Sequence, residues 1–359
     1  MNHIFKIRAA LAPADLDAVL LTCRANRFYA SGFDSYDTDG VCLVTADAAY
    51  YWTDGRYIEA AGRQVQDAEV GLTDAGKPYH TLIAGAIKRH GIRRLGIDDG
   101  YMTLADYRRY RDQLPCELLP ATSVLTRLRA RKDAAELARM ERAQRIAEEA
   151  LEEVLNDIRP GVTEQFLAAR LVFLMRNAGA ENVSFDPIVI SGAKTSMPHG
   201  VPSGKQVEAG DFVTMDFGAL CEGYCSDMTR TVAVGSATEE MEQVYETVLS
   251  AQKAGIAMAR AGVAGSVVDG AARRVIAKAG YGDYFTHSFG HSLGVEIHEA
   301  PNASPSNPEP LPEGAVVSAE PGIYLPGKFG VRIEDVVVLE EEGCRNLTRA
   351  PKALQILPG

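Results

Sequence analysis

The sequence predicts an α/β domain followed by a second domain in which pairs of helices alternate with groups of strands. The chain has 359 residues, a length that suggests two domains. In its first third, short apolar or β-branched runs bounded by turn residues alternate with helical segments. Beyond residue 132, two long helices precede strands, and the same order then returns, which hints at an internal repeat.

The first domain is predicted to span residues 1–125. Strands are expected at residues 18–22, 41–45, 49–53 and 95–98. Residues 57–66 and 79–90 have helical character between them. A basic, polar stretch near residues 122–131 then marks the boundary.

The second domain is predicted to span residues 132–359 and to open with a long helix. Asp133 can cap that helix and Glu136, three residues on, completes a capping box. Pro160 and Gly161 end it, and Thr163 caps a second helix that runs to residue 177. A second helix pair is expected at residues 239–259 and 266–279. Strands are expected at residues 212–219, 224–234, 315–320 and 330–339.

Charge and composition exclude several classes of protein. Residues 1–130 hold 16 basic and 16 acidic residues, so the net charge of −11 belongs to the rest of the chain. A nucleic-acid-binding protein would need a basic face. No apolar run approaches the ~20 residues that span a membrane, and Asp15 and Asp17 interrupt the only candidate signal-peptide stretch. The six cysteines are sparse, and with no export signal we expect reduced thiols in a cytoplasmic protein.

The strands at residues 212–219 and 224–234 suggest a hairpin that carries two aspartates. With its turn centred between Cys221 and Glu222, Asp216 and Asp227 would face each other directly. Opposed like charges are destabilising, and a divalent cation shared by both carboxylates would remove the repulsion. A bulge or a different register could instead turn one aspartate to solvent, and the hairpin alone leaves both interpretations open.

Further polar residues cluster in the C-terminal part of the chain. His287, His291 and His298 lie within one short stretch, although the whole chain has only seven histidines. Glu320 is expected at a strand end, where the following proline stops the ladder. Glu334 is expected inside a β-branched strand and on the same face as Arg332. A carboxylate buried there would need a partner.

Six phrases in this order carry a resemblance to a known family. They are MDFG at 215–218, SDMTRT at 226–231, GHSLG at 290–294, IHEAP at 297–301, EPGIY at 320–324 and VRIED at 331–335. Together they resemble the metallopeptidases of the pita-bread fold, the group of aminopeptidase P, prolidase and methionine aminopeptidase. YASGF at 29–33 and TDGRY at 53–57 resemble the creatinase-type N-terminal domain. The resemblance implies an α/β creatinase-type domain followed by an α+β pita-bread catalytic domain, and it points to the proline-directed branch.

The resemblance also implies roles for individual residues. Five of them match the ligands of two divalent metal ions: Asp216, Asp227, His291, Glu320 and Glu334. His199, His287 and His298 match histidines that contact the substrate or lie just outside the ligands, Arg332 matches an arginine hydrogen-bonded to the carboxylates, and Glu320 matches the proton shuttle. Four carboxylates and one imidazole favour manganese or cobalt over zinc, and we expect manganese.

The activity implied is cleavage of the peptide bond before proline in proline-containing peptides. In prolidases that resemble this chain, an arginine between the equivalents of His298 and Glu320 binds the terminal carboxylate of the dipeptide. Residues 299–319 contain no arginine or lysine, which favours an aminopeptidase P-like activity over a strict Xaa-Pro dipeptidase. A lyase acting on a small sulfonium compound and a binding protein that has lost catalysis are further uses of this scaffold.

The resemblance further implies a homodimer or homotetramer, whereas the acidic charge and the lack of a long apolar run predict no nucleic-acid or membrane partner. We also expect the N-terminal domain to supply substrate contacts through residues 32–40. That loop is rich in turn and polar residues and includes Phe33, Tyr36 and Asp37. An ordinary solvent-exposed loop explains the same composition.

Overall fold

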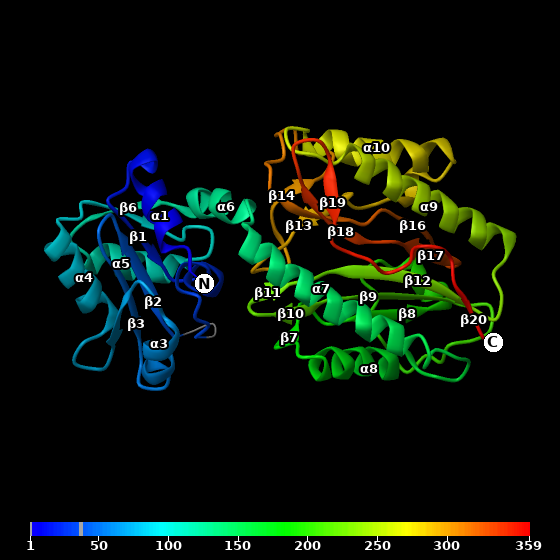
Figure 1. Cartoon of the computed structure of the whole chain (residues 1–359), viewed down its shortest axis with the longest axis horizontal. Coiled ribbons are helices and arrows are strands. Elements are labelled where there is room, and N and C mark those ends of the chain that lie inside the picture. Colours follow the sequence, from blue (N-terminus) through cyan, green and yellow to red (C-terminus); the bar gives the residue numbers. More distant parts are fainter. Residues whose placement is uncertain (1, 36–38) are drawn as a thin grey trace. The chain divides into compact units, whose positions relative to one another are not determined.

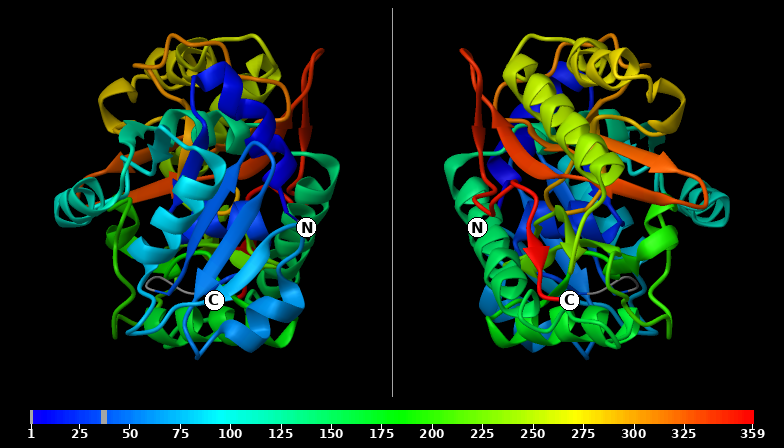
Figure 2. Two further views of the ribbon diagram at one scale, coloured as in Figure 1. Left: turned by 90° about the vertical axis from the view of Figure 1, so that its left-hand side faces the viewer. Right: turned by 90° about the vertical axis from the view of Figure 1, so that its right-hand side faces the viewer.

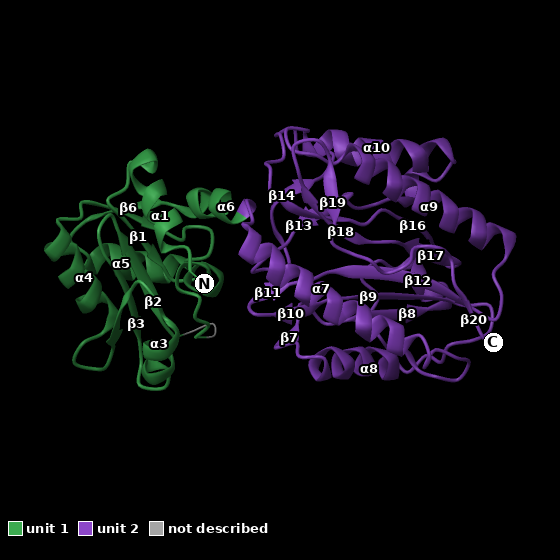
Figure 3. Cartoon of the chain, viewed as in Figure 1, with its two compact units in different colours: residues 1–129 green, residues 130–359 purple. Residues whose placement is uncertain are grey.

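The computed structural model describes residues 2–35 and 39–359 and divides the chain into two compact units, Met1–Arg129 and Ala130–Gly359 (Figures 1 and 3). The stretch that the sequence marks as a boundary forms helix α6 (Thr122–Ala130). Tyr36 and Asp37, in the N-terminal loop expected to contact substrate, lie outside the described residues. Among the residues that are described, no helix combines the length and apolar character needed to cross a membrane.

Unit 1 is built on a six-stranded mixed sheet with the order β4-β3-β2-β1-β5-β6. Its strands are β1 (Ala18–Leu21), β2 (Val41–Thr45), β3 (Ala49–Thr53), β4 (Glu69–Leu72), β5 (Arg94–Ile97) and β6 (Glu117–Pro120). The four predicted strands are confirmed as β1, β2, β3 and β5. The two that the sequence missed, β4 and β6, are edge strands with exposed ends, so no apolar run reveals them.

Helices cover both faces of this sheet because its central strands are buried on both sides. Helices α1 (Ile4–Leu11), α2 (Arg24–Ser31), α3 (Ile58–Gln64) and α6 share one apolar cluster with Val19 and Leu21. Helices α4 (Tyr79–His90) and α5 (Leu104–Gln113) share the other with Ala18 and Leu20. Successive residues of β1 therefore point to opposite faces of the sheet. A short 3-10 helix, η1 (Ala12–Ala14), precedes β1.

Unit 2 places one pair of helices against each of two sheets, which are antiparallel except that the last strand of the chain pairs in parallel with its neighbour. The sequence predicted this order of a helix pair followed by strands (Figures 1 and 2). The helices are α7 (Ala134–Val154), α8 (Glu164–Asn177), α9 (Glu239–Met258) and α10 (Gly265–Lys278). The sheet next to α7 and α8 has the order β20-β12-β9-β8, made of β8 (Ile188–Ser191), β9 (Phe212–Phe217), β12 (Met228–Val234) and β20 (Ile356–Leu357).

The sheet next to α9 and α10 has the order β14-β13-β15-β18-β19. Its strands are β13 (Gly290–Ser292), β14 (Glu299–Ala303), β15 (Val316–Ala319), β18 (Asp335–Leu339) and β19 (Cys344–Asn346). Two smaller sheets complete the unit, formed by β7 (Asn182–Val183), β10 (Ala219–Cys221) and β11 (Tyr224–Cys225), and by β16 (Gly322–Leu325) and β17 (Phe329–Arg332). Two 3-10 helices, η2 (Gly192–Ser196) and η3 (Gly282–Tyr284), lie in connections.

The predicted helix starts in unit 2 are confirmed at atomic detail. Asp133 accepts from the backbone N–H of Glu136 (3.0 Å), and the Glu136 carboxylate accepts from the N–H of Asp133 (2.9 Å), which completes the capping box. Thr163 caps α8 by accepting from the N–H of Phe166. Helix α7 ends at Val154, several residues before the Pro160 that was expected to stop it.

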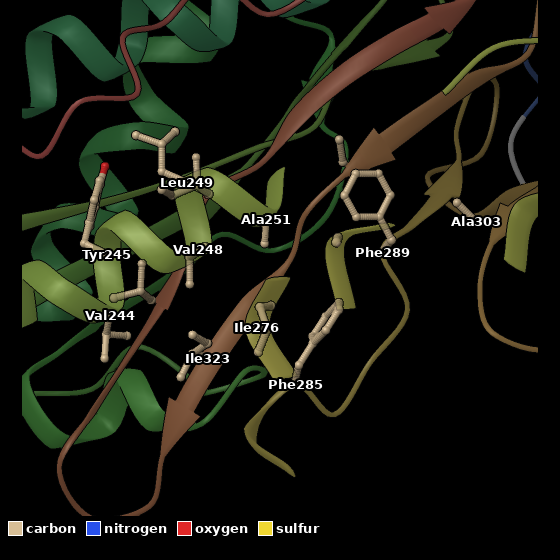
Figure 4. Packing of buried hydrophobic residues seen from close by; sticks show 14 of the residues in the cluster. Val244, Tyr245, Val248, Leu249, Ala251, Ile276, Phe285, Phe289, Ala303 and Ile323 are labelled. Carbon is tan, nitrogen blue, oxygen red and sulfur yellow. The ribbon is translucent and has the colours of Figure 1, made fainter. Parts of the chain in front are cut away.

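The strand that carries His291 is anchored in the core beneath α9 and α10. Phe289, which precedes β13, is 1% exposed and packs in one cluster with Val248 and Ile276 (Figure 4). A side chain at Gly255 of α9 would place its Cβ 2.3 Å from the Phe289 ring. The absence of a side chain there lets the helix lie directly on the ring, which fixes the position of β13.

A single buried arginine joins the C-terminal segment to the sheet that contains β12. Arg230 donates to the carbonyls of Ala350 (2.7 Å), Pro351 (2.9 Å) and Glu334 (2.5 Å). Its guanidinium also pairs with Asp335 at 2.9 Å. Since breaking a buried ion pair typically costs ~3–5 kcal/mol, this contact is a strong constraint on where Glu334 and the chain end lie.

Candidate metal centre

Two aspartates come from neighbouring strands of the hairpin. Asp216 lies in β9, where it faces Thr229 of β12, and Asp227 directly precedes β12. The prediction that the two aspartates face each other is therefore wrong by two residues. The turn is centred between Glu222 and Gly223, whose φ angles of 49° and 78° suit a tight hairpin. A shift of two residues keeps side chains on the same face, so the aspartates are diagonal neighbours.

His291 and Glu320 come from two paired strands of the other sheet. His291 lies in β13, and Glu320 follows β15 directly. The Ser318 hydroxyl connects them, because it accepts from the backbone N–H of His291 (2.9 Å) and donates to Glu320 Oε1 (2.9 Å). A Cβ at Gly290 would lie 1.9 Å from the Ser318 carbonyl oxygen. Glycine at this position lets the two strands approach closely enough to bring both side chains together.

Glu334 lies where the chain passes from one sheet to another. The single strand predicted at residues 330–339 is wrong, since β17 pairs with β16 whereas β18 pairs with β15. The backbone N–H of Glu334 donates to the Thr229 carbonyl (3.1 Å), and the Thr229 hydroxyl donates to Glu334 Oε2 (2.7 Å). These two bonds to β12 replace ladder pairing at the break and hold the buried carboxylate beside Asp227.

The five predicted ligands line one cavity of about 450 Å³. His291 Nε2 lies 3.5 Å from Asp227 Oδ2 and 3.3 Å from Glu320 Oε1. One potential ligand atom from each of Asp227, His291 and Glu334 lies within 4.8 Å of the others. Residues far apart in the sequence thus converge on a space that a cation could share.

Buried carboxylate oxygens without partners test whether these residues fit metal ions. Asp216 Oδ1, Asp227 Oδ1 and Glu334 Oε1 are buried, and no described residue donates a hydrogen bond to them. Leaving such an oxygen unsatisfied is costly. Divalent cations would satisfy all three, and four carboxylates with one imidazole form a hard donor set that suits them. The residues therefore fit the pair of cations that the sequence predicted.

The cluster shifts the protonation of its own members. Burial raises the pKa of Asp227 to about 7 despite the opposing contact with His291, and repulsion from Asp216 adds to the rise. Burial also raises the pKa of Glu334 well above its ordinary value, with repulsion from Asp227 next. Burial alone would lower the pKa of His291, but its contact with Asp227 raises that pKa to about 9. With no cation to balance these carboxylates, protons are held in the cluster.

We expect metal binding to release more protons at pH 6 than at pH 8. Asp227, with a pKa of about 7, is mostly protonated at the lower pH and mostly ionised at the higher one, and ligands must lose their protons to bind. Titrating chelator-treated protein with Mn²⁺ in buffers of different ionisation enthalpy measures the protons released. Equal release at both pH values would contradict the shift.

The raised pKa of Asp227 also predicts how the free energy of unfolding of the chelator-treated protein depends on pH. Because the folded state favours the protonated Asp227 side chain, this carboxyl group contributes fully to the free energy of unfolding below about pH 4, the ordinary pKa of an unfolded aspartate. That contribution is lost as the pH rises through about 7. At pH 8 the chelator-treated protein has lost this stabilisation, and protons no longer compete with the metal for Asp227. We therefore expect added metal to raise the unfolding temperature more at pH 8 than at pH 6.

Arg332 donates hydrogen bonds to Asp216 and to three other groups around the cavity. Its Nη2 donates to Asp216 Oδ2 at 2.6 Å, and its Nε donates to the Thr229 hydroxyl at 3.0 Å. Its Nη1 donates to the Tyr324 hydroxyl (3.0 Å) and to the Pro198 carbonyl (3.3 Å). With 5% of its side chain exposed, this guanidinium orients one carboxylate and also reaches the segment that carries His199.

His287 has both ring nitrogens engaged. Nδ1 lies 2.9 Å from the Ser288 carbonyl, which can only accept, so Nδ1 carries the proton and Nε2 accepts from the Tyr324 hydroxyl (2.8 Å). Burial lowers the pKa of His287, in keeping with a neutral ring. Its Nδ1 lies 4.0 Å from Glu320 Oε2. A hydrogen bond from His287 to a substrate would therefore replace an existing bond.

His298 and His199 differ from His287 in having free rings. Both side chains line the cavity, and neither ring forms a hydrogen bond with another described residue. The His298 ring packs edge-on against the His291 ring, with centroids 4.5 Å apart, and burial lowers its pKa. His199 follows η2 in an exposed segment at the cavity rim. These two imidazoles are available to a bound molecule.

Several residues around the cavity had no role assigned from the sequence. Thr229 and Tyr324 lie inside two of the recognised phrases but bind Glu334, Arg332 and His287 through contacts that no spacing reveals. The cavity wall also includes the neutral and apolar side chains of Phe185, Ile188, Ile297 and Asn302. Nothing in the sequence distinguishes these apolar residues from ordinary core positions.

Two family models match the chain. The model described as metallopeptidase family M24 matches residues 138–341. The model described as the creatinase/prolidase N-terminal domain matches residues 4–131. An uncharacterized peptidase of Bacillus subtilis strain 168, YqhT, is 41% identical over 98% of this chain and 99% of its own length.

Solved structures cover nearly the whole chain. The Xaa-Pro dipeptidase from Bacillus anthracis is 41% identical, with a TM-score of 0.93 over 99% of each chain. The X-Pro aminopeptidase from Thermotoga maritima MSB8 is 36% identical, with the same TM-score of 0.93, over 99% of this chain and 100% of its own. The resemblance in fold that the six phrases indicated is confirmed, and the names of the relatives include both dipeptidase and aminopeptidase.

Proposed function

Because the chain belongs to metallopeptidase family M24, we propose that it hydrolyses the peptide bond before proline and releases the first residue of Xaa-Pro-Yaa and longer peptides. The cavity wall carries this proposal. Residues 299–319 contain no arginine or lysine, and the residue of that stretch that lines the cavity is the neutral Asn302. A dipeptidase must bind the terminal carboxylate of its substrate, for which a cation is the natural partner. Without a cation in this stretch, the site has no charged partner that would favour a free carboxylate on proline over a peptide that continues past it.

We infer that Asp216, Asp227, His291, Glu320 and Glu334 hold two divalent cations, with manganese preferred and cobalt or zinc as alternatives. When bound, such a pair lowers the pKa of a water molecule and stabilises the charge that develops on the scissile carbonyl. The three unpartnered carboxylate oxygens support this ligand set. Arg332 orients Asp216 through its short hydrogen bond.

Glu320 is the proposed general base. Its Oε1 accepts from Ser318, which leaves Oε2 facing the cavity beside His287. Oε2 would take the proton of the attacking water and return it to the proline nitrogen as the peptide bond breaks. The free ring of His298 would donate a hydrogen bond to the carbonyl oxygen as it becomes negative, and His199 would contact the substrate at the rim. His287 would keep its place beside Glu320.

An Xaa-Pro dipeptidase is the second candidate function. The name of the Bacillus anthracis relative, which is 41% identical over 99% of both chains, favours it. A cation from another part of the molecule or from a neighbouring subunit could bind the terminal carboxylate in that case. The lyase and the binding protein, in contrast, have no support among the relatives compared, which are named as peptidases. We also keep a homo-oligomeric state and a cytoplasmic location as predictions.

The test is kcat/KM on Ala-Pro against Ala-Pro-Ala and a longer analogue. We expect the tripeptide to be cleaved at least as efficiently as the dipeptide. Installing a cation by Asn302→Arg should shift preference toward Ala-Pro by about tenfold, the value of a charged hydrogen bond. Ser306→Arg, which adds the same single positive charge at a neutral, exposed residue of the same segment outside the cavity lining, is the matched control. A preference of the native enzyme for Ala-Pro above tenfold would replace the aminopeptidase proposal with the dipeptidase.

A further inference from the structure

One buried carboxylate outside the metal centre binds both ends of the segment that carries His199. Glu164, the first residue of α8, is fully buried. Its Oε1 accepts from the backbone N–H (2.8 Å) and the hydroxyl (3.1 Å) of Ser191. Its Oε2 accepts from the backbone N–H (3.0 Å) and the hydroxyl (2.8 Å) of Ser203, and from the Lys194 ammonium. The carboxylate thus spans residues 191–203.

Lys194 extends this contact toward His199. Its ammonium also donates to the Val201 carbonyl (2.9 Å) and the Ser203 hydroxyl (2.9 Å). On the other side of His199, the Pro198 carbonyl accepts from Arg332. The His199 ring itself has no hydrogen bond with a described residue. Its position therefore depends on how firmly residues 194–203 are held.

The charge state of Glu164 suits this task. Burial alone would raise the pKa of Glu164, but hydrogen bonds from Lys194 and Ser203 lower it below its ordinary value. An ionised carboxylate offers only acceptors, and every group around this one is a donor. An amide of the same shape would present an N–H₂ group to those donors.

We propose that Glu164 is a positioning residue that fixes His199 at the rim of the active site through Lys194 and Ser203. This rests on the proposed function, in which His199 contacts the substrate. A carboxylate that only stabilised the fold would be equally well buried. Its removal, however, would lower kcat/KM to the same extent whether or not the His199 side chain is present, and this difference separates the two roles.

The experiment is a double-mutant cycle on kcat/KM for Ala-Pro-Ala. We expect Glu164→Gln to lower kcat/KM roughly 10- to 100-fold, as a misplaced contact does, mainly through KM and with the metal content unchanged. In the His199→Ala background the same substitution should have almost no further effect. Losses that multiply in the double variant would overturn the proposal. Should Glu164→Gln fail to fold, Ser203→Ala takes its place, because it removes only one of the five donors to the carboxylate, the Ser203 hydroxyl.

Hydrogen exchange of the backbone amides supplies a readout that needs no activity. Glu164→Gln should speed exchange across residues 197–203, whereas the matched carboxylate-to-amide change Asp157→Asn should not. Asp157, in the turn that follows α7, pairs at 3.0 Å with Arg170 of α8 and forms no hydrogen bond or ion pair with the described residues 191–203. Unchanged exchange would overturn the proposal even if no Xaa-Pro peptide is cleaved, and faster exchange without any peptidase activity would refute only the proposed function.

Discussion

Replacing Asp227 with alanine is expected to abolish peptidase activity and to empty at least one of the two proposed cation positions. Asp227 lies at the middle of the cluster, 3.5 Å from His291 Nε2 and beside Glu334. Its side chain is 5% exposed, and its Oδ1 has no hydrogen-bond partner among the described residues. The loss should exceed the roughly 10- to 100-fold that removal of an outer hydrogen-bond partner costs a metal site.

Metal content by mass spectrometry and kcat on Ala-Pro-Ala measure this result together. Asp227→Asn, which keeps the shape of the side chain, separates loss of charge from a cavity in the core. Asp283→Ala, at an exposed aspartate of η3, is the control for a surface carboxylate. Two ions per chain together with native turnover in Asp227→Ala would remove this residue from the ligand set.

Replacing Glu320 with glutamine is expected to lower kcat by about 10²- to 10⁴-fold while the fold persists. The amide oxygen can still accept from Ser318, as Oε1 does now at 2.9 Å. The amide cannot take a proton from water, so the step that needs a base is lost. KM should change little, because the cavity keeps its shape.

The matched control is Glu313→Gln, the same change at an exposed glutamate shortly before β15. Metal content measured beside kcat separates loss of the base from loss of a ligand. A native kcat with both ions bound would move the base to another group, such as the ring of His298, which also lines the cavity.

Local signals made much of the fold predictable. The caps at Asp133 and Thr163 are formed by residues within three positions of each other, so the sequence contains the whole interaction. The hairpin register depends instead on Glu222, a non-glycine residue with a φ of 49°. Nothing in the residue type marks that conformation, and the turn was placed one residue too early. The break between β17 and β18 is hidden in the sequence because apolar and polar residues alternate from Val331 to Glu334, past the end of β17.

The candidate site was predictable as a set of residues but not as a set of contacts. Motif order identified side chains that the structure gathers around one cavity. The partners of those side chains come from distant segments. Tyr324, for example, forms a hydrogen bond with His287, and the Ser318 carbonyl lies against Gly290. The role of Glu164 could not be predicted from the sequence, because acidic residues are common in the first turn of any helix. Only the fold reveals that Glu164 binds residues 191–203.

The contacts of Arg230 have a consequence for how the protein is made. The guanidinium that holds the Glu334 carbonyl also binds the carbonyls of Ala350 and Pro351, and β20, almost at the chain end, pairs with β12. Domains begin to fold during translation, but a chain synthesised only as far as Glu334 still lacks Ala350, Pro351 and β20. The bonds between Glu334 and Thr229 of β12 can form at that stage, whereas the contacts of Arg230 with those two later residues cannot. The candidate ligand Glu334 is therefore made before the segment that anchors it, and that anchor is complete only once the chain extends through β20.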